Sequence, residues 1–218
     1  MKTEILSSLE HLPYFTIQAV KQYFPYEEYQ KGTVQTAVYR WVKSGKIIRL
    51  KKGVYTTRKF SDLHRNDFDF PIMVSSIIVP QSYVSTHFIL QQNSILTEAT
   101  YLISAVTVKH GQSIDNDIGS YVYQHIKKKL FTGYILSDYY GVTIARATKA
   151  KALFDYFYLR PISGNTLIKK NSIVEELRLN IDEFSTKEKE EFEGYINSEG
   201  GPKMNAILRN IQEHVWRA

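Results

Sequence analysis

Apolar residues recur at helical spacing over residues 33–44, where the pattern is the clearest in the chain. The stripe falls at i, i+3, i+4, i+7 and i+8 and consists of Val34, Ala37, Val38, Trp41 and Val42. This spacing predicts an amphipathic helix with one buried face. Thr33 stands where an N-cap is expected, and Ser44-Gly45 would end the helix.

Two shorter helices are predicted before this one. Residues 3–10 place three apolar side chains on one side, and residues 17–24 repeat apolar side chains at helical spacing. We expect Thr16 to be the N-cap of the second helix and Pro25 to end it.

A basic β-hairpin is predicted after these helices. Residues 46–50 (KIIRL) and 54–57 (VYTT) favour strands, and Gly53 between them supplies the backbone freedom that a tight turn needs. Three short helices followed by a hairpin describe a winged helix-turn-helix, which we assign to residues 1–60.

The rest of the chain predicts a second domain over residues 75–218. Residues 56–75 are polar with mixed charge and are interpreted as a connection. From Ser76 onward, short β-rich runs alternate with helical stretches, which indicates an antiparallel or mixed sheet packed by helices. A mostly acidic helical tail covers about 171–218, with a break at 198–202. The expected fold class is therefore α+β.

Net positive charge is confined to the first domain. Residues 1–60 contain eleven Lys or Arg and four Asp or Glu, whereas the remaining chain carries seventeen basic and eighteen acidic side chains. Positive charge clustered on a compact module is typical of a surface that meets phosphates. We therefore expect duplex DNA as a partner.

The predicted domain suggests which residues would contact DNA. The exposed face of the third helix would enter the major groove, and the hairpin tip would lie against the backbone. The candidate DNA-binding residues are Thr33, Gln35, Thr36, Tyr39, Arg40, Lys43, Arg49, Lys51 and Lys52. In the alternative hypothesis the module docks an acidic protein instead of DNA. The tail, with six basic and ten acidic residues over 171–218, is an internal candidate for that partner.

Several classes of protein are excluded by composition. The chain has no cysteine, so disulfides, thiolate metal sites and a cysteine nucleophile are ruled out. The first thirteen residues lack an apolar signal-peptide core, and the longest apolar run, near 77–80, is too short to span a bilayer. We expect a cytoplasmic protein with no membrane partner.

The chain resembles the AbiEi-type antitoxins of type IV toxin–antitoxin systems over roughly residues 3–160. The resemblance rests on GKIIRLKKGVYTT at 45–57 and on PQSYVSTH at 80–87, where a serine and a histidine open a helix. It also rests on ATKAKALFD at 147–155, which is similar to the family stretch Ala-Ser-Pro-Glu-Lys-Ala-Leu-x-Asp. Lys149 and Ala150 stand in place of its proline and glutamate.

The resemblance implies a bacterial transcriptional regulator that binds inverted repeats in its own promoter and represses its operon. The second domain would neutralise a nucleotidyltransferase-like toxin without forming a stable complex with it. No catalytic residue, metal ion or cofactor follows from the resemblance.

Enzymatic alternatives have weaker support. Ser82, Ser85, His87 and Asp155 have the composition of a triad, but no Gly-x-Ser-x-Gly turn accompanies them. The six histidines are scattered without metal-ligand spacing. A metal-dependent nuclease could use Asp155 with Lys149 and Lys151, yet its carboxylates lack a distinctive spacing. We therefore expect no enzyme.

A run of three lysines, 127–129, leaves two interpretations open. It is either a solvated loop, which we favour, or part of a second basic surface. That surface would also include Arg146, Lys149 and Lys151.

Overall fold

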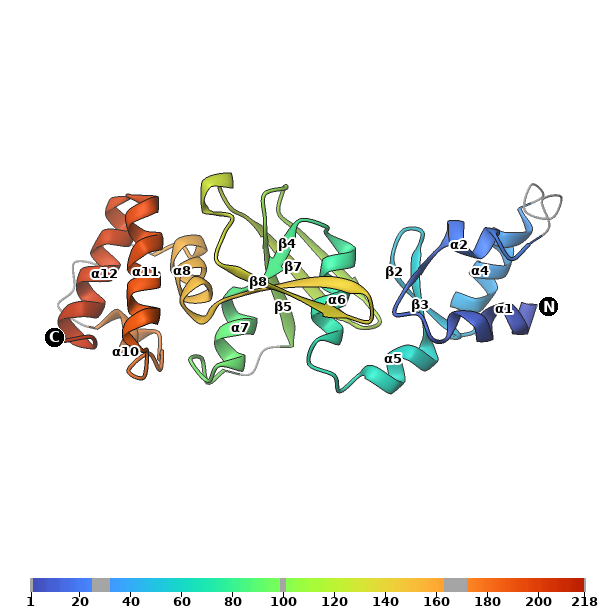
Figure 1. Cartoon of the computed structure of the whole chain (residues 1–218), viewed down its shortest axis with the longest axis horizontal. Helices are drawn as coiled ribbons and strands as arrows, with labels where there is room; N and C mark the ends of the chain where they lie inside the picture. Colours follow the sequence, from blue (N-terminus) through green and yellow to red (C-terminus); the bar gives the residue numbers. More distant parts are fainter. Residues whose placement is uncertain (1, 25–31, 99–100, 163–171, 218) are drawn as a thin grey trace.

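The computed structural model describes residues 2–24, 32–98, 101–162 and 172–217. The molecule is mixed α+β with two separate sheets, as the sequence predicts. Its elements form successive layers along the long axis, with the N-terminal helices at one end and the C-terminal helices at the other (Figure 1).

The N-terminal unit, as far as the structure describes it, combines short helices with a three-stranded antiparallel sheet. Its elements are α1 (Lys2–Leu9), β1 (Phe15–Thr16), α2 (Ile17–Lys21), α4 (Thr33–Lys43), β2 (Ile47–Lys51) and β3 (Val54–Thr57). The strand order is β1-β3-β2, with both pairs antiparallel. The predicted third helix and the predicted hairpin are thus both present.

The two expected helix caps differ in outcome. Thr16 caps α2 as predicted, because its hydroxyl oxygen accepts a hydrogen bond from the Ala19 amide at 3.2 Å. Thr33 does not cap α4. Gly32 is the N-cap there, with a φ of +73° that favours glycine, and Thr33 is the first helical residue. The predicted end of the second helix at Pro25 lies outside the described residues.

The small sheet is covered on both faces. Ile47 on β2 belongs to the core of the N-terminal unit, together with side chains of α1, α2 and α4. Ile48 and Leu50 alternate with it and belong instead to the core of the following layers. The hairpin therefore joins two hydrophobic cores.

The segment expected to be a polar connection is helical. It contains α5 (Arg58–His64) and α6 (Phe70–Ile78), and α6 lies against the central sheet. Residues 70–78 are apolar on nearly all sides, so periodicity could not separate a helix from a strand there. The boundary expected at 75 falls inside α6.

The central sheet has six strands and is mixed. Its strands are β4 (Ser82–Val84), β5 (Leu102–Thr107), β6 (Gln112–Asn116), β7 (Gly119–His125), β8 (Tyr134–Tyr139) and β9 (Val142–Ala147). Their order is β6-β7-β5-β4-β9-β8, in which β4–β9 and β5–β7 are parallel and the other pairs antiparallel. Helix α6 covers one face, and α7 (Thr86–Gln92) and α8 (Lys149–Leu159) cover the other (Figure 1).

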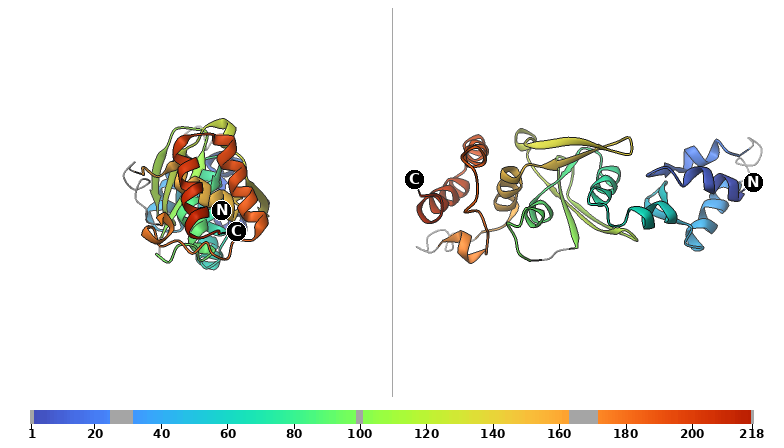
Figure 2. Two further views of the ribbon diagram at one scale, coloured as in Figure 1. Left: turned by 90° about the vertical axis from the view of Figure 1, so that its left-hand side faces the viewer. Right: turned by 60° about the horizontal axis from the view of Figure 1, so that its bottom comes forward.

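The C-terminal layer packs on α8. It contains α10 (Ile173–Glu176), α11 (Thr186–Glu199) and α12 (Pro202–His214), so the tail is helical only in part. The predicted break between its helices is confirmed, because Gly200 ends α11 with a φ of +76° and Pro202 begins α12. Figure 1 and the right-hand view of Figure 2 place this layer at the opposite end of the molecule from the N-terminal unit.

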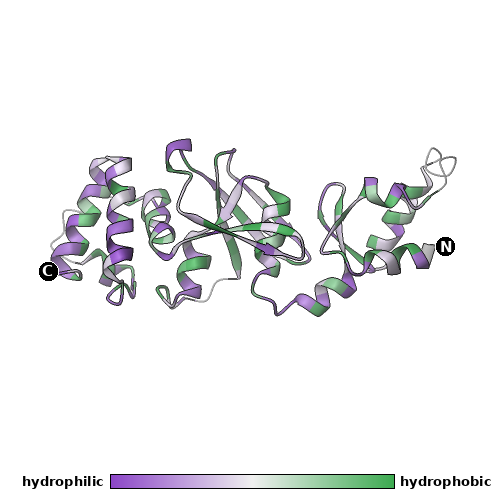
Figure 3. Cartoon of the chain, viewed as in Figure 1, coloured by the Kyte–Doolittle hydropathy of each residue, from purple (hydrophilic) through white to green (hydrophobic). Residues whose placement is uncertain are grey.

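Hydrophobic residues are frequent in the middle of the molecule. In Figure 3, where the ribbon is coloured by the hydropathy of each residue, they occur along α6 and the central strands, whereas α11 has long hydrophilic stretches. The acidic tail lies at the end of the molecule opposite to the basic unit (Figure 1). The alternative hypothesis suggested that the tail folds back onto this unit, and the structure does not show that arrangement.

Candidate nucleic-acid interface

Helix α4 presents a polar face to solvent at the end of the molecule. Its apolar stripe is buried as predicted, with the exception of Val42, which is 37% exposed. The opposite face is exposed and consists of Gln35, Thr36, Tyr39, Arg40 and Lys43. Tyr39 is 65% exposed, so its ring is accessible on this face. Thr33 is half-buried at the first turn.

The hairpin places two of its three predicted basic residues in solvent. Arg49 and Lys52 are exposed, and Gly53 turns the chain with a φ of +79°. The register shifts between Arg49 and Lys51, so Leu50 is an additional residue that points into the central core. The bulge lies between Arg49, which is exposed, and Lys51, which is half-buried.

Lys51 is held against helix α6. Its ammonium donates hydrogen bonds to the carbonyl oxygens of Ile77, at 2.5 Å, and Ile78, at 3.2 Å. These carbonyls belong to the last turn of α6, which has no helical amide left to bond them and carries partial negative charge. Lys51 therefore links the hairpin to the central layers, a use that its sequence position did not reveal.

Further polar contacts fix the same junction. The side-chain amide of Asn116, at the end of β6, donates to the carbonyl of Leu50 at 3.2 Å. The Arg58 guanidinium bonds Asp117 at 3.3 Å in an exposed ion pair. These partners lie in a segment of the second domain that carried no sequence motif, so sequence reasoning missed them.

Lys51 has a second lysine nearby. Partial burial lowers the pKa of Lys51, and the ammonium of Lys109 lowers it further. Lys109 is exposed in the turn after β5, far from the hairpin in the sequence. The fold thus brings together two basic residues that the sequence keeps apart.

The residues that match the family motifs in the second domain form a buried polar network. The Lys151 ammonium donates to Asp155 Oδ1 and to the Leu130 carbonyl, both at 2.8 Å. Asp155 Oδ2 accepts hydrogen bonds from Tyr83, at 2.9 Å, and Ser85, at 2.8 Å. Lys151 and Asp155 are both fully buried. The two residues are four positions apart on α8, and the structure places their ion pair in the core.

The network has the properties of a structural element. Burial raises the pKa of Asp155 and lowers that of Lys151, while their mutual attraction opposes both shifts. Each polar atom of the pair is bonded within the protein, so Asp155 has no free oxygen aimed at solvent for a metal ion. Among the described residues, no three acidic or histidine side chains are grouped for metal binding. The nuclease hypothesis therefore gains no support from Asp155.

The residues with the composition of a triad are not arranged as one. Ser82 donates to the Val79 carbonyl at 2.7 Å, and Ser85 donates to Asp155. The His87 ring packs edge-on against Tyr156, with centroids 5.0 Å apart. Burial beside this ring, with the Arg160 charge nearby, lowers the pKa of His87. Both serine hydroxyls thus serve other partners.

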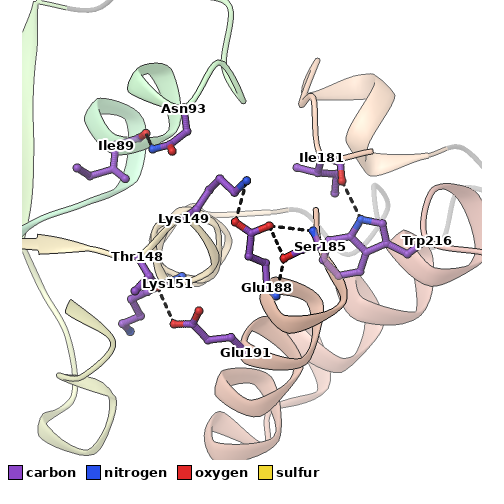
Figure 4. A network of polar contacts seen from close by, with 10 residues as sticks. All are labelled: Ile89, Asn93, Thr148, Lys149, Lys151, Ile181, Ser185, Glu188, Glu191 and Trp216. Atoms are coloured by element: carbon purple, nitrogen blue, oxygen red, sulfur yellow. Dashed lines mark hydrogen bonds and ion pairs between the residues drawn. The ribbon is translucent and has the colours of Figure 1, made fainter. Parts of the chain in front are cut away.

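The second basic surface considered from the sequence is not formed. Lys149 pairs with Glu188 at 2.8 Å, Lys151 is buried, and Arg146 pairs with Asp69 at 2.7 Å. Figure 4 shows Lys149 and Thr148, at the start of α8, meeting Glu188 and Glu191 of α11. These basic residues hold the layers together. Of the lysine run, 127–129, all three members are exposed, and Lys129 bonds carbonyls at the end of α11.

Comparison with known proteins identifies no relative. No protein-family model matches the chain, and no curated protein matches it. Within the described residues, no helix combines the length and apolar character needed to cross a membrane. The exposed residues of the N-terminal unit are therefore the main indication of function.

Proposed function

We propose that the chain is a transcriptional regulator that binds duplex DNA through a winged helix-turn-helix at its N-terminus. Helix α4 would enter the major groove, and the tip of the β2–β3 hairpin would contact the flanking backbone. The observation that carries the proposal is the exposed face of α4, where five polar or basic side chains lie opposite a buried apolar stripe.

The element order of the N-terminal unit supports this reading. Helix, strand, helix, helix and hairpin follow one another, and the three strands form one antiparallel sheet. Arg40 and Lys43 on α4 and Arg49 and Lys52 on the hairpin are all exposed. Such basic side chains attract phosphates before any base contact forms.

The second part of the proposal follows from the resemblance to AbiEi-type antitoxins. The protein would repress its own operon at inverted repeats and would neutralise a nucleotidyltransferase-like toxin through the second domain, residues 75–218, without a stable complex. The layered second domain offers a separate body for that role, at a distance from α4 (Figure 1).

A gel shift with the duplex upstream of the gene, against an unrelated duplex of equal length, tests DNA binding. Preferential retardation of the upstream duplex is expected. Arg40→Ala should weaken binding by about 1–3 kcal/mol if Arg40 makes a bidentate base contact.

Arg209→Ala is the matched control. Arg209 is also an exposed arginine on a helix, but it lies on α12 at the other end of the molecule. Equal losses in the two variants would show that binding follows net charge alone. Failure to bind either duplex at low salt would favour the alternative, a module that docks an acidic protein.

A further inference from the structure

A cavity of about 500 Å³ opens between the end of α6, strands β8 and β9, and the segment that follows β7. Its volume lies within the range of roughly 300–1,000 Å³ that small-molecule sites occupy. No residue of the candidate DNA interface lines it. It is thus a separate feature of the central layers.

The wall of this cavity is largely apolar and in part aromatic. Phe131 and Tyr134 pack against each other with centroids 5.3 Å apart, and Leu136 lines the same space. Leu136 is 60% exposed, although it lies on a strand of the central sheet. An exposed leucine beside aromatic rings leaves apolar surface that a ligand would cover.

The polar residues that line the cavity come from several elements. Ser76 and Gln81 lie at the end of α6 and in the turn after it, Ser82 lies on β4, Thr143 on β9, and Lys128 in the lysine run. Lys128 is the one charged residue among those that line the cavity, and it is exposed. An apolar wall with one ammonium fits a ligand that has an apolar ring and an anionic group.

The backbone at the cavity is strained. Gln81 has a φ of +64°, a conformation that non-glycine residues rarely adopt. Its carbonyl is held in place by the Thr107 hydroxyl, which donates to it at 2.9 Å. Strain of this kind gathers at binding sites because the surrounding structure must enforce it.

We propose that this cavity binds a small organic anion with an apolar ring, such as an aromatic carboxylate or sulfonate. The ring would lie on Phe131, Tyr134 and Leu136, and the anionic group would meet Lys128. Lys128 thereby gains a role that neither the sequence motifs nor the DNA interface gives it.

The site lies next to the hairpin anchor. Ser76, Pro80 and Gln81 line the cavity, while Ile77 and Ile78 of the same turn accept the hydrogen bonds of Lys51. A ligand that packs on this turn would restrict the motion of the Ile77 and Ile78 carbonyls, which bind Lys51 of the hairpin. We therefore expect the ligand to tighten DNA binding, and this part of the inference rests on the proposed function.

Two fluorescent probes test the site without DNA. The probes are 8-anilinonaphthalene-1-sulfonate and its uncharged counterpart N-phenyl-1-naphthylamine. The full chain should bind each saturably at one site. Lys128→Ala should weaken binding of the sulfonate by about fivefold, the upper range for an exposed ion pair, and leave the uncharged probe unchanged. Lys127→Ala, a change to the exposed neighbour that does not line the cavity, should alter neither probe.

Filling the cavity should abolish binding of both probes. Ala145→Leu adds volume at the wall, and Thr143→Tyr does so at an exposed position that is tolerant of larger side chains. Unchanged sulfonate binding in Thr143→Tyr, with a native melting temperature, would overturn the proposal. Equal loss of both probes in Lys128→Ala would overturn the assignment of the anionic group.

The coupling to DNA is a separate measurement. Saturating sulfonate should tighten DNA binding by the wild type and should have no effect on Lys51→Ala, which lacks the anchor. Probe binding without an effect on DNA affinity would retain the site and overturn the coupling. Absence of DNA binding in every sample would count against the proposed function alone.

Discussion

Two adjacent lysines in the hairpin have different environments that the sequence does not distinguish. Lys51 and Lys52 are equivalent in the sequence, and both were expected to contact phosphates. The structure separates them, because Lys51 bonds the last carbonyls of α6 while Lys52 is exposed. A burial pattern predicts which face a residue occupies, but not a partner that lies 26 positions away.

The two lysines should therefore respond differently to substitution. Lys52→Ala should weaken binding to every DNA sequence and reduce the salt dependence by about one unit in the slope of log K against log salt. Lys51→Ala should lower the melting temperature, because two carbonyls at the end of α6 lose their partner. Thermal denaturation and a salt titration of each variant make the comparison. A lower melting temperature in Lys52→Ala alone would reverse the assignment.

The buried Lys151–Asp155 pair should dominate the stability of the second domain. Lys151→Met leaves the Asp155 carboxylate buried without its cation, which costs about 3–5 kcal/mol. Replacing both residues, as Lys151→Met with Asp155→Leu, should be less destabilising, since no isolated charge remains. Urea denaturation measures both. A single variant that loses less than about 1 kcal/mol would show that the pair is not the anchor that its burial indicates.

At the scale of elements, the sequence was informative wherever one face of an element is buried. Helix α4 and the β2–β3 hairpin were predicted because their burial differs between faces. Helix α6 was missed because it is buried nearly all round and therefore has no period. The exposure of the polar face of α4 was predicted for the same reason as the helix itself. Its anchoring by α6 and β6 depends on tertiary contacts that no local pattern encodes.

Helix α11 shows how one residue can serve both an element and its packing. Glu188 completes a capping box with Ser185 and also pairs with Lys149 at the start of α8 (Figure 4). Burial raises the pKa of Glu188, but the hydrogen bonds from Lys149 and Ser185 together exceed that effect and hold the pKa below the ordinary 4.5. The charged form is thus favoured in the folded protein.

The stability from Glu188 should therefore depend on pH. A carboxyl with a lowered folded pKa contributes stability that is present above its unfolded value of 4.5 and is lost as the pH falls through the folded value. Glu188→Gln should reduce stability near pH 7 and make the decrease toward pH 3 shallower than in the wild type. Urea denaturation at several pH values measures this difference. Parallel curves for the two proteins would contradict the assignment.

At the scale of the whole molecule, two functions are proposed for two ends of one layered body. The basic unit and the acidic C-terminal layer lie apart (Figure 2), so the tail does not cover α4. The hairpin connects the two cores through Ile48 and Leu50. The DNA-binding proposal concerns the N-terminal unit, and the antitoxin proposal concerns the second domain.

The two proposed functions should be separable in the full chain. Arg40→Ala combined with Lys52→Ala alters only exposed side chains and should abolish operator binding without changing the fold. Co-expressed with a nucleotidyltransferase-like toxin of the proposed kind, the double variant should still restore growth. Circular dichroism provides the control for folding. Loss of growth rescue in a folded variant would show that antitoxicity also requires the DNA-binding surface.

The salt dependence of DNA binding reports how many basic side chains of the protein contact phosphates. Fluorescence anisotropy of a labelled upstream duplex, titrated from low to physiological salt, gives log K against log salt for the wild type and for Arg49→Ala with Lys52→Ala. With the exposed side chains of Lys43, Arg49 and Lys52 on phosphates, the wild-type slope should be about −3, and the double variant should lose about two units. A slope that is the same in both proteins would contradict the proposed binding mode, because the hairpin would then not contact the DNA backbone.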